Sequence, residues 1–352
     1  MRCEMSNNNV VLQSQEEALT AVSKLLETIK QRAANTDINS CVPRETIDEL
    51  LNAGLFSVVK SKKFGGSDLG FSTLVKVGIE IASACGSTGW VYGVLAGHSW
   101  LLNLFPEKAQ QEIFADPRAL TATIFRMNGT ITEDDGGYRL NGGTGCFCSG
   151  VDFADWVIIG NQITYADGRP PKPHFFIIPR SDAEIIDDWN TVGMRGTGSK
   201  TIKVAENTFI PAHRAVSLDD MLNGTSPGAD FHKEAIYRLP FSEVVPFSIT
   251  AAPLGMAKGA MQVYTKMTKA RLKEATEEEL LQNTYAITEL AIAQTGLEAG
   301  IGLVVGDAER IDNLAKGTDM SPADRVRIPR NWAYAVDQAR QSTNQVFKGN
   351  LY

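Results

Sequence analysis

Residues 120–125 read Leu-Thr-Ala-Thr-Ile-Phe, and at this stretch the chain changes from helical to extended periodicity. β-branched and aromatic residues favour strands because their side chains pack well on a pleated surface. Short runs of the same kind follow at 138–140, 156–159, 175–178 and 201–204. The first of them comes directly after Asp-Asp-Gly-Gly, which is typical of a hairpin turn. Closely spaced short strands of this type predict a compact all-β barrel or sandwich.

Upstream of this region the pattern is helical. Apolar residues recur at three- and four-residue steps, as on one face of an amphipathic helix, at Ala18, Val22, Leu25, Leu26 and Ile29. A second apolar helix is expected at about residues 72–84. Ser87 or Thr88 is suited to cap the next helix, which carries the most apolar run of the chain.

Downstream of a Gly/Pro/Ser-rich linker, the pattern is helical again. Three long apolar patterns, at 240–275, 277–311 and 322–347, are typical of bundle helices. The predicted fold class is therefore α+β multidomain. The expected parts are an N-terminal all-helical domain at 1–117, a central β-barrel domain at 118–222 and a C-terminal helical bundle at 223–352.

Charge and composition exclude several kinds of partner. With 34 basic and 41 acidic side chains, the net charge of −7 argues against nucleic acid and against an anionic membrane. The most membrane-like run, 90–105, is interrupted by His98, Ser99 and Asn103 and is shorter than the roughly 20 residues of a span. The five cysteines are irregularly spaced, which favours a reducing compartment. Because residues 1–9 also lack an apolar signal core, we expect a cytoplasmic protein.

Metal and nucleotide-binding patterns are weak. Cys146 and Cys148 alternate along an expected strand and could face one side of it, but the chain has four histidines and no second cysteine pair, which argues against zinc. Residues 193–198, Gly-Met-Arg-Gly-Thr-Gly, resemble a phosphate loop but lack the following Gly-Lys-Ser/Thr. We therefore expect no metal site and neither a Rossmann fold nor a P-loop.

Three motifs carry candidate site residues. In the first, Ser87-Thr-Gly-Trp90 is followed eight residues later by His98, so both side chains lie near one face of a helix. A core tryptophan and a buried histidine bonded to backbone would give the same pattern. The second motif, Gly145-Cys-Phe-Cys-Ser149-Gly150, ends in a serine that is also a common turn former. The third, Gly193-Met-Arg-Gly-Thr-Gly-Ser199, is a glycine-rich loop that enters an alternating strand.

In this order, and across this plan of helices, strands and helices, the three motifs resemble the acyl-CoA dehydrogenase fold superfamily. Within it the chain resembles the oxygenase component of two-component flavin-dependent monooxygenases, the 4-hydroxyphenylacetate hydroxylase and indole-3-acetate monooxygenase group. The similarity runs from about residue 16 to the end. Residues 124–129, Ile-Phe-Arg-Met-Asn-Gly, depart from the pattern of the dehydrogenases of this fold.

The resemblance implies an activity. Such a protein uses reduced FMN or FAD and O2 to oxygenate a small aromatic substrate of the phenol or indole acid type. A separate flavin reductase supplies the reduced flavin. The chemistry needs a dry apolar pocket with a few placed hydrogen-bond donors, since water entry releases peroxide instead of product. The alternatives are an acyl-CoA dehydrogenase with bound FAD and a non-enzymatic relative.

The resemblance also implies roles for individual residues. His98 and Ser149 match the catalytic positions: the histidine faces the substrate and polarises a ring hydroxyl, and the serine lies beside flavin N5. The implied cofactor-binding residues are Trp90, Ile124, Phe147, Ser149 and Arg271. Arg271 matches a helix arginine that reaches a flavin phosphate, often across a subunit contact, although Lys-Ala-Arg-Leu-Lys-Glu-Ala is also an ordinary charged helix face. We expect Trp90 and Ser149 to line a water-shielded slot that holds the isoalloxazine.

Two departures from the family pattern give further expectations. Gly145 stands where many members carry tryptophan, which implies a more open cofactor wall. The sequence stops at 346–352, where roughly one more helix normally follows, so the bundle is expected to be truncated. Because three long amphipathic helices leave a broad apolar face, we also expect a homo-oligomer, a tetramer formed through the bundle.

Overall fold

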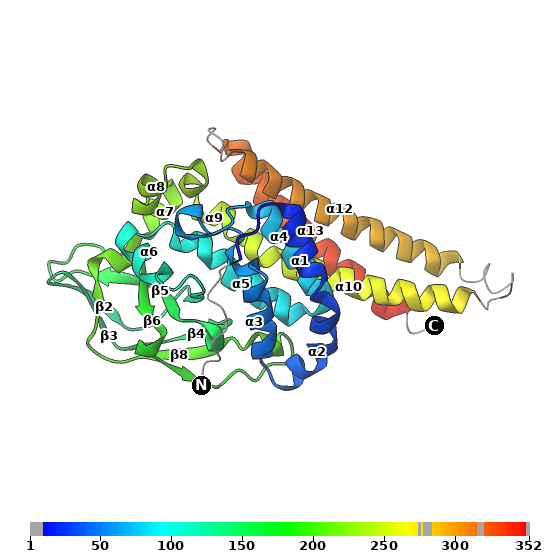
Figure 1. Cartoon of the computed structure of the whole chain (residues 1–352), viewed down its shortest axis with the longest axis horizontal. Coiled ribbons are helices and arrows are strands. Elements are labelled where there is room, and N and C mark those ends of the chain that lie inside the picture. Colours follow the sequence, from blue (N-terminus) through cyan, green and yellow to red (C-terminus); the bar gives the residue numbers. More distant parts are fainter. Residues whose placement is uncertain (1–9, 274–275, 277–283, 315–319, 350–352) are drawn as a thin grey trace.

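A central group of strands is preceded and followed by helices in the computed structural model, which describes residues 10–273, 276, 284–314 and 320–349. Figure 1 shows the strands gathered at one end of the molecule, with the long C-terminal helices projecting from the other. The order of helices, strands and helices predicted from the sequence is confirmed.

Six α-helices form the part that precedes the strands within the described residues. They are α1 (Gln15–Ser23), α2 (Leu26–Ile38), α3 (Arg44–Asn52), α4 (Phe71–Ala84), α5 (Gly86–Leu102) and α6 (Glu107–Phe114). Between α4 and α5 only Cys85 is non-helical, with an extended backbone. The membrane-like run is a buried helix, as expected, because thirteen of the seventeen residues of α5 are buried. No helix among the described residues is long and apolar enough to cross a membrane.

The strands form two sheets and not the closed barrel that the sequence predicted. They are β1 (Thr121–Ile124), β2 (Thr130–Asp134), β3 (Gly137–Asn141), β4 (Gly143–Cys148), β5 (Trp156–Thr164), β6 (Lys172–Pro179), β7 (Ala183–Ile186), β8 (Lys200–Val204), β9 (Thr208–Pro211) and β10 (Ala215–Ser217). Seven strands make one sheet in the order β10-β6-β5-β2-β3-β9, with β1 paired parallel to β5. The other sheet is β4-β8-β7. The expected hairpin at Asp135 and Gly136 joins β2 to β3.

The strands are followed by three short and three long helices within the described residues. These are α7 (Leu218–Asn223), α8 (Pro227–His232), α9 (Phe241–Val244), α10 (Pro246–Leu272), α12 (Thr284–Leu314) and α13 (Pro322–Gly349). The expected boundary between residues 222 and 223 falls inside α7, and that between 117 and 118 falls between α6 and β1. The start of the predicted helix 277–311 lies outside the described residues up to 283, as do residues 350–352 at the end of the chain.

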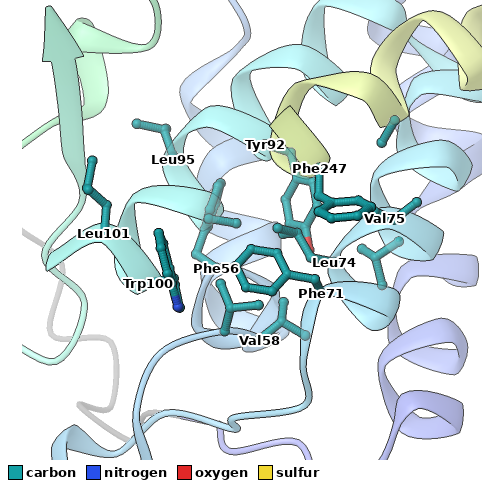
Figure 2. Packing of buried hydrophobic residues seen from close by; sticks show 14 of the residues in the cluster. Phe56, Val58, Phe71, Leu74, Val75, Tyr92, Leu95, Trp100, Leu101 and Phe247 are labelled. Atoms are coloured by element: carbon teal, nitrogen blue, oxygen red, sulfur yellow. The ribbon is translucent and has the colours of Figure 1, made fainter. Parts of the chain in front are cut away.

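Aromatic side chains hold the early and late helices together. Phe71 of α4 meets the Trp100 ring edge-on at 5.5 Å and the Phe247 ring at 6.1 Å. The Phe247 ring in turn packs edge-on against Trp332 of α13 at 5.1 Å. Figure 2 shows Phe71, Trp100 and Phe247 within one buried apolar group drawn from α4, α5 and α10. Edge-to-face rings of this kind add to the stabilisation from apolar burial alone.

Close backbone contact fixes the position of α5, the helix that carries both Trp90 and His98. Gly93 of α5 faces the Ser248 carbonyl of α10, and a Cβ at this position would collide with that oxygen. Gly89 similarly faces Ala82 of α4. Small residues are therefore needed here for the helices to approach, and the approach sets where the rest of α5 lies.

We expect Phe247→Ala to lower the free energy of unfolding by about 3–5 kcal/mol, because a fully buried aromatic ring is removed from between three helices. The control is Ile38→Ala, since that apolar side chain is 69% exposed and its loss should cost less than about 0.5 kcal/mol. Urea denaturation measures both. Equal costs for the two variants would contradict this assignment of the core.

Candidate active site

A chain of hydrogen bonds joins α5 to Ser149, which directly follows β4, and to the loop that precedes β8. The Trp90 indole Nε1 donates to Ser149 Oγ at 3.1 Å. Ser149 Oγ lies 2.7 Å from Ser199 Oγ, which lies 2.6 Å from Thr197 Oγ1. Thr197 Oγ1 is 2.9 Å from the Met194 carbonyl oxygen. The three hydroxyl-bearing residues are all buried. The structure thus brings all three sequence motifs together.

The bond from the Thr197 hydroxyl to the Met194 carbonyl, an oxygen that also accepts from the N–H groups of Thr197 and Trp189, sets the direction of the other hydrogen bonds in this chain. A carbonyl oxygen only accepts, so the Thr197 hydroxyl donates to Met194. With that proton used, Thr197 must accept from Ser199, and Ser199 must then accept from Ser149. An indole N–H can only donate, which agrees with the hydrogen bond from Trp90 to Ser149.

This direction defines what Ser149 can still do. A hydroxyl has one proton and two acceptor lone pairs. The proton of Ser149 is committed to Ser199 and one lone pair accepts from Trp90. The remaining capacity is therefore one acceptor site, suited to an incoming N–H donor.

The contact between Trp90 and Ser149 changes the expected shape of the slot. The two side chains were expected to line it together, and they do lie together, but they are directly hydrogen-bonded at 3.1 Å. No planar ring fits between atoms at that distance. Trp90 and Ser149 consequently belong to one wall, and a bound ring has to lie beside the pair.

Phe147 occupies a strained backbone position next to Ser149. Its φ of +70° lies in the left-handed region, which bulky residues rarely adopt, and the β4–β8 pairing shifts register between Gly145 and Cys148. The ring is 68% exposed and meets the Trp189 ring edge-on at 5.9 Å. Such strain is often found at functional sites, where it presents a side chain that regular geometry would place elsewhere.

The same bulge separates the two cysteines that regular alternation would have placed on one side. Cys146 is exposed and Cys148 is buried. Across the described residues, no group of three or more histidine, cysteine, aspartate or glutamate side chains is placed to hold a metal ion. Cys3 lies outside the described residues.

Ile124 fills the space that Gly145 leaves. An added Cβ at Gly145 would lie 2.6 Å from Ile124 Cγ2, so the isoleucine side chain packs directly over the glycine. The expectation of a more open wall at Gly145 is wrong for this reason. Ile124 itself is only 1% exposed and belongs to the core between the sheets, so its contact with a cofactor stays a prediction.

His98 lies on the same helix but faces β1. Its Nδ1 is 2.6 Å from the Thr121 carbonyl oxygen, which only accepts, so Nδ1 carries the proton. Nε2 has no hydrogen-bond partner within the part of the chain that the structure describes. Burial lowers the pKa of His98 to about 4, although its bond to the Thr121 carbonyl opposes this shift. At neutral pH the imidazole is therefore neutral and offers a bare Nε2 as a hydrogen-bond acceptor.

Arg271 is not brought to the other candidates. It lies exposed in the last turn of α10. In Figure 1 the C-terminal end of α10 projects away from the strands that carry Phe147 and Ser149. Within one copy of the chain, its expected contact with a flavin phosphate has no support from the arrangement of these elements.

Sequence reasoning assigned no role to Ser199 and Thr197, although both stand in a motif that it singled out. The signal that could have found them is the pair of hydroxyl side chains, two residues apart, in the glycine-rich loop that enters β8. Lys200, the next residue, binds the Asp152 carboxylate at 3.0 Å and fixes this loop beside the end of β4.

Comparison with known proteins agrees with this geometry. The acyl-CoA dehydrogenase N-terminal domain family matches residues 13–119, and the acyl-CoA dehydrogenase C-terminal domain family matches residues 247–349. A pigment production hydroxylase from Rhodococcus sp. (strain ATCC 21145) is 32% identical over 334 residues, which cover 95% of this chain and 85% of that protein. The chain belongs to the acyl-CoA dehydrogenase superfamily, in its flavin-dependent monooxygenase branch.

Two further relatives share this branch. The oxygenase component of an FADH(2)-dependent resorcinol hydroxylase from Rhizobium sp. is 31% identical over 327 residues, covering 90% of this chain and 79% of that protein. The crystal structure of 3-HSA hydroxylase from Rhodococcus sp. RHA1 has a TM-score of 0.90 at 31% identity, covering 95% of this chain and 86% of the other. The resemblance to oxygenase components of two-component flavin monooxygenases is confirmed.

We expect the imidazole of His98 to remain neutral, protonated on Nδ1, throughout the neutral pH range, with a titration midpoint at about pH 4. Since a free histidine titrates near pH 6.5, the unfolded chain binds this proton first. The folded state therefore loses stability as the pH falls from about 6.5 to 4. Nitrogen-detected NMR, assigned with His98→Asn, measures the tautomer and the midpoint. A midpoint near 6.5 would show that the ring is not desolvated.

Proposed function

We propose that this protein is the oxygenase component of a two-component flavin-dependent monooxygenase, which uses reduced FMN or FAD and O2 to oxygenate a small aromatic substrate of the phenol or indole acid type. The observation that carries the proposal is the single unused acceptor site on buried Ser149. Reduced flavin carries an N–H donor at N5 that the oxidised form lacks. The site is therefore matched to the reduced form, which such an oxygenase receives from a separate flavin reductase.

The neighbouring residues fit a flavin ring beside Ser149. Phe147 offers an exposed aromatic face next to it, and the half-buried Trp90 indole closes one side. Both side chains are apolar apart from the indole N–H, which is already bonded to Ser149. When bound there, reduced flavin would supply the electrons that activate O2. The protein's part is to exclude water and to keep Ser149 in its accepting orientation.

His98 suits the aromatic substrate. A neutral imidazole whose Nε2 carries no proton can accept a hydrogen bond from the O–H of a phenol or the N–H of an indole. This bond polarises the donor and raises the electron density of the substrate ring. An imidazolium could not do this. Burial of His98 is thus part of its proposed role, because it keeps the ring in the accepting form.

A homotetramer in the cytoplasm is the proposed assembly. Several apolar side chains on the long helices are exposed in the single chain, including Met256, Val263, Met267, Ile292 and Val326. Exposed apolar surface of this extent favours burial against another copy. A second copy would also offer Arg271 a route to the flavin phosphate that the single chain lacks. Light scattering tests this proposal, and a monomer at micromolar concentration would contradict it.

The direct test supplies chemically reduced FMN or FAD, O2 and a panel of phenols and indole acids to the purified protein. We expect an oxygenated aromatic product, with no need for a nicotinamide cofactor or acyl-CoA. The acyl-CoA dehydrogenase alternative predicts instead a yellow protein with bound FAD that acyl-CoA bleaches anaerobically. That result, or the absence of any oxygenated product across the panel, would refute the proposed function.

Replacement of Ser149 by alanine should increase the fraction of reduced flavin that ends as hydrogen peroxide, because the N–H acceptor beside the ring is lost. A missing hydrogen bond in a buried site corresponds to about a tenfold change in partitioning. Ser181→Ala is the matched control, since Ser181 is exposed and its hydroxyl donates to the neighbouring Asp182 carboxylate. Peroxide yield per flavin oxidised measures the effect. Equal yields from Ser149→Ala and the parent protein would remove Ser149 from this role.

A further inference from the structure

A small cavity of about 20 Å³ lies between the early helices and the start of β1. Its lining comes from the chain between residues 51 and 60, from α5, from the end of α6 and from residues 117–121. Figure 2 labels two of its apolar lining residues, Phe56 and Leu95. A space of this size holds one water molecule or one small ion, since a single water needs roughly 10–15 Å³. The cavity is separate from the hydrogen-bonded group around Ser149, none of whose members lines it.

Two cationic side chains line this cavity, and neither forms an ion pair with a residue that the structure describes. Lys60 is buried, with only 3% of its surface exposed. The Arg118 guanidinium donates to the side-chain oxygen of Asn52 at 3.0 Å instead of to a carboxylate. None of the described residues that line the cavity is an aspartate or a glutamate. A buried positive charge without a counter-ion is costly, because the protein interior solvates it poorly.

The protein satisfies the Lys60 ammonium only in part. Its Nζ donates to the Pro117 carbonyl oxygen at 3.2 Å and lies 4.4 Å from the centre of the Phe114 ring. An ammonium carries three protons, so a donor is left over after these two contacts. Burial lowers the pKa of Lys60 to about 8, and the negative charge of Asp116 opposes this shift. At neutral pH the side chain is therefore still charged and has a donor for a ligand in the cavity.

Thr121 supplies a second unused donor. The residue lines the cavity, and its buried Oγ1 has no hydrogen-bond partner among the described residues. Buried hydroxyl groups are rarely left unpaired, since the lost hydration is not replaced. Ser99 also lines the cavity, but its hydroxyl already donates to the Ala96 carbonyl at 2.7 Å. Unused protons on Lys60 and Thr121, around one small space, indicate a bound acceptor.

The charge of the lining favours an anion over water as this acceptor. A water molecule can accept from both donors, but it leaves the positive charges of Lys60 and Arg118 uncompensated. A halide ion accepts from several donors at once and supplies the missing negative charge. Carboxylates and phosphates are larger than the single water molecule that the cavity holds. Size and charge together therefore select a monatomic anion.

We propose that this cavity binds one halide ion, chloride under ordinary conditions, held by the Lys60 ammonium, the Arg118 guanidinium and the Thr121 hydroxyl. The site takes no part in the proposed oxygenase chemistry and does not depend on it. The ion joins the segment between α3 and α4 to the start of β1. Because the Thr121 carbonyl oxygen accepts from His98 Nδ1, the ion also stabilises the part of β1 that orients this histidine.

A diffraction experiment tests whether the cavity holds a halide or water. Crystals of the full chain grown in sodium bromide are measured at the bromine absorption edge, where bromide scatters anomalously and water does not. We expect one anomalous peak in the cavity of the parent protein. We expect none in Lys60→Met, a change that keeps an unbranched side chain and removes the charge. A cavity without an anomalous peak in the parent protein would overturn the proposal.

Melting temperatures test whether the ion binds in solution. We expect a saturable rise with sodium chloride and with sodium bromide, but not with sodium gluconate at the same ionic strength, since gluconate is too large for the cavity. Lys60→Met should abolish this rise. Lys108→Met, the same change at an exposed lysine on α6, should respond as the parent protein does. An equal rise with gluconate, or the parent's response to chloride in Lys60→Met, would contradict the proposal.

Thr121→Val provides a second variant if Lys60→Met does not fold. Valine has the shape of threonine, and the hydroxyl that it removes has no partner in the described chain. Without halide, Thr121→Val should therefore melt no lower than the parent protein. Its half-saturating chloride concentration should rise about tenfold, as expected for loss of a hydrogen bond to a charged group. An unchanged half-saturating concentration would show that Thr121 does not bind the ion and would overturn the proposed site.

Discussion

The proposed site depends on one chain of hydrogen bonds. It begins at the Trp90 indole N–H, passes through the hydroxyl groups of Ser149, Ser199 and Thr197, and ends at the Met194 carbonyl. It joins α5, the end of β4 and the loop before β8, three segments far apart in the sequence. The direction follows from the Thr197 hydroxyl, which donates to the Met194 carbonyl, and from the Trp90 indole N–H, which can only donate. Buried hydrogen-bond networks that are fully satisfied are rigid, since every alternative leaves a polar group unpaired.

The fold protects this arrangement by placing its parts on rigid elements. Glycines let α5 approach α4 and α10 closely, and buried aromatic rings hold those helices to α13. The same packing keeps water from His98 and so keeps its imidazole neutral. Position and protonation state thus have one cause, the dense packing around α5. A change that loosened this packing would alter both together.

The helix–strand–helix order could be predicted from the sequence, because apolar periodicity carries that information, and the family resemblance implied that Trp90 and Ser149 lie near one another. Sheet closure could not, since the pairing of β1 with β5 and of β4 with β8 joins distant segments. The bulge at Phe147 could not be predicted either. Regular alternation would place Cys146 and Cys148 on one side of the strand, whereas in the structure Cys146 is exposed and Cys148 is buried. Gly145 suggested open space because the sequence does not show that Ile124 packs over it. The direction of the hydroxyl chain follows only from distances, which no sequence motif supplies.

The account depends most on Ser149 being an acceptor because Ser199 takes its proton. Reduced flavin has a donor at N5 and oxidised flavin has an acceptor there, so the most direct measurement is the ratio of the two dissociation constants, in the parent protein and in Ser199→Ala. The account predicts that the parent protein prefers reduced flavin. It also predicts that Ser199→Ala brings the two dissociation constants closer together, since the Ser149 hydroxyl can then donate to N5 of oxidised flavin. A folded Ser199→Ala protein with the parent's ratio would contradict it.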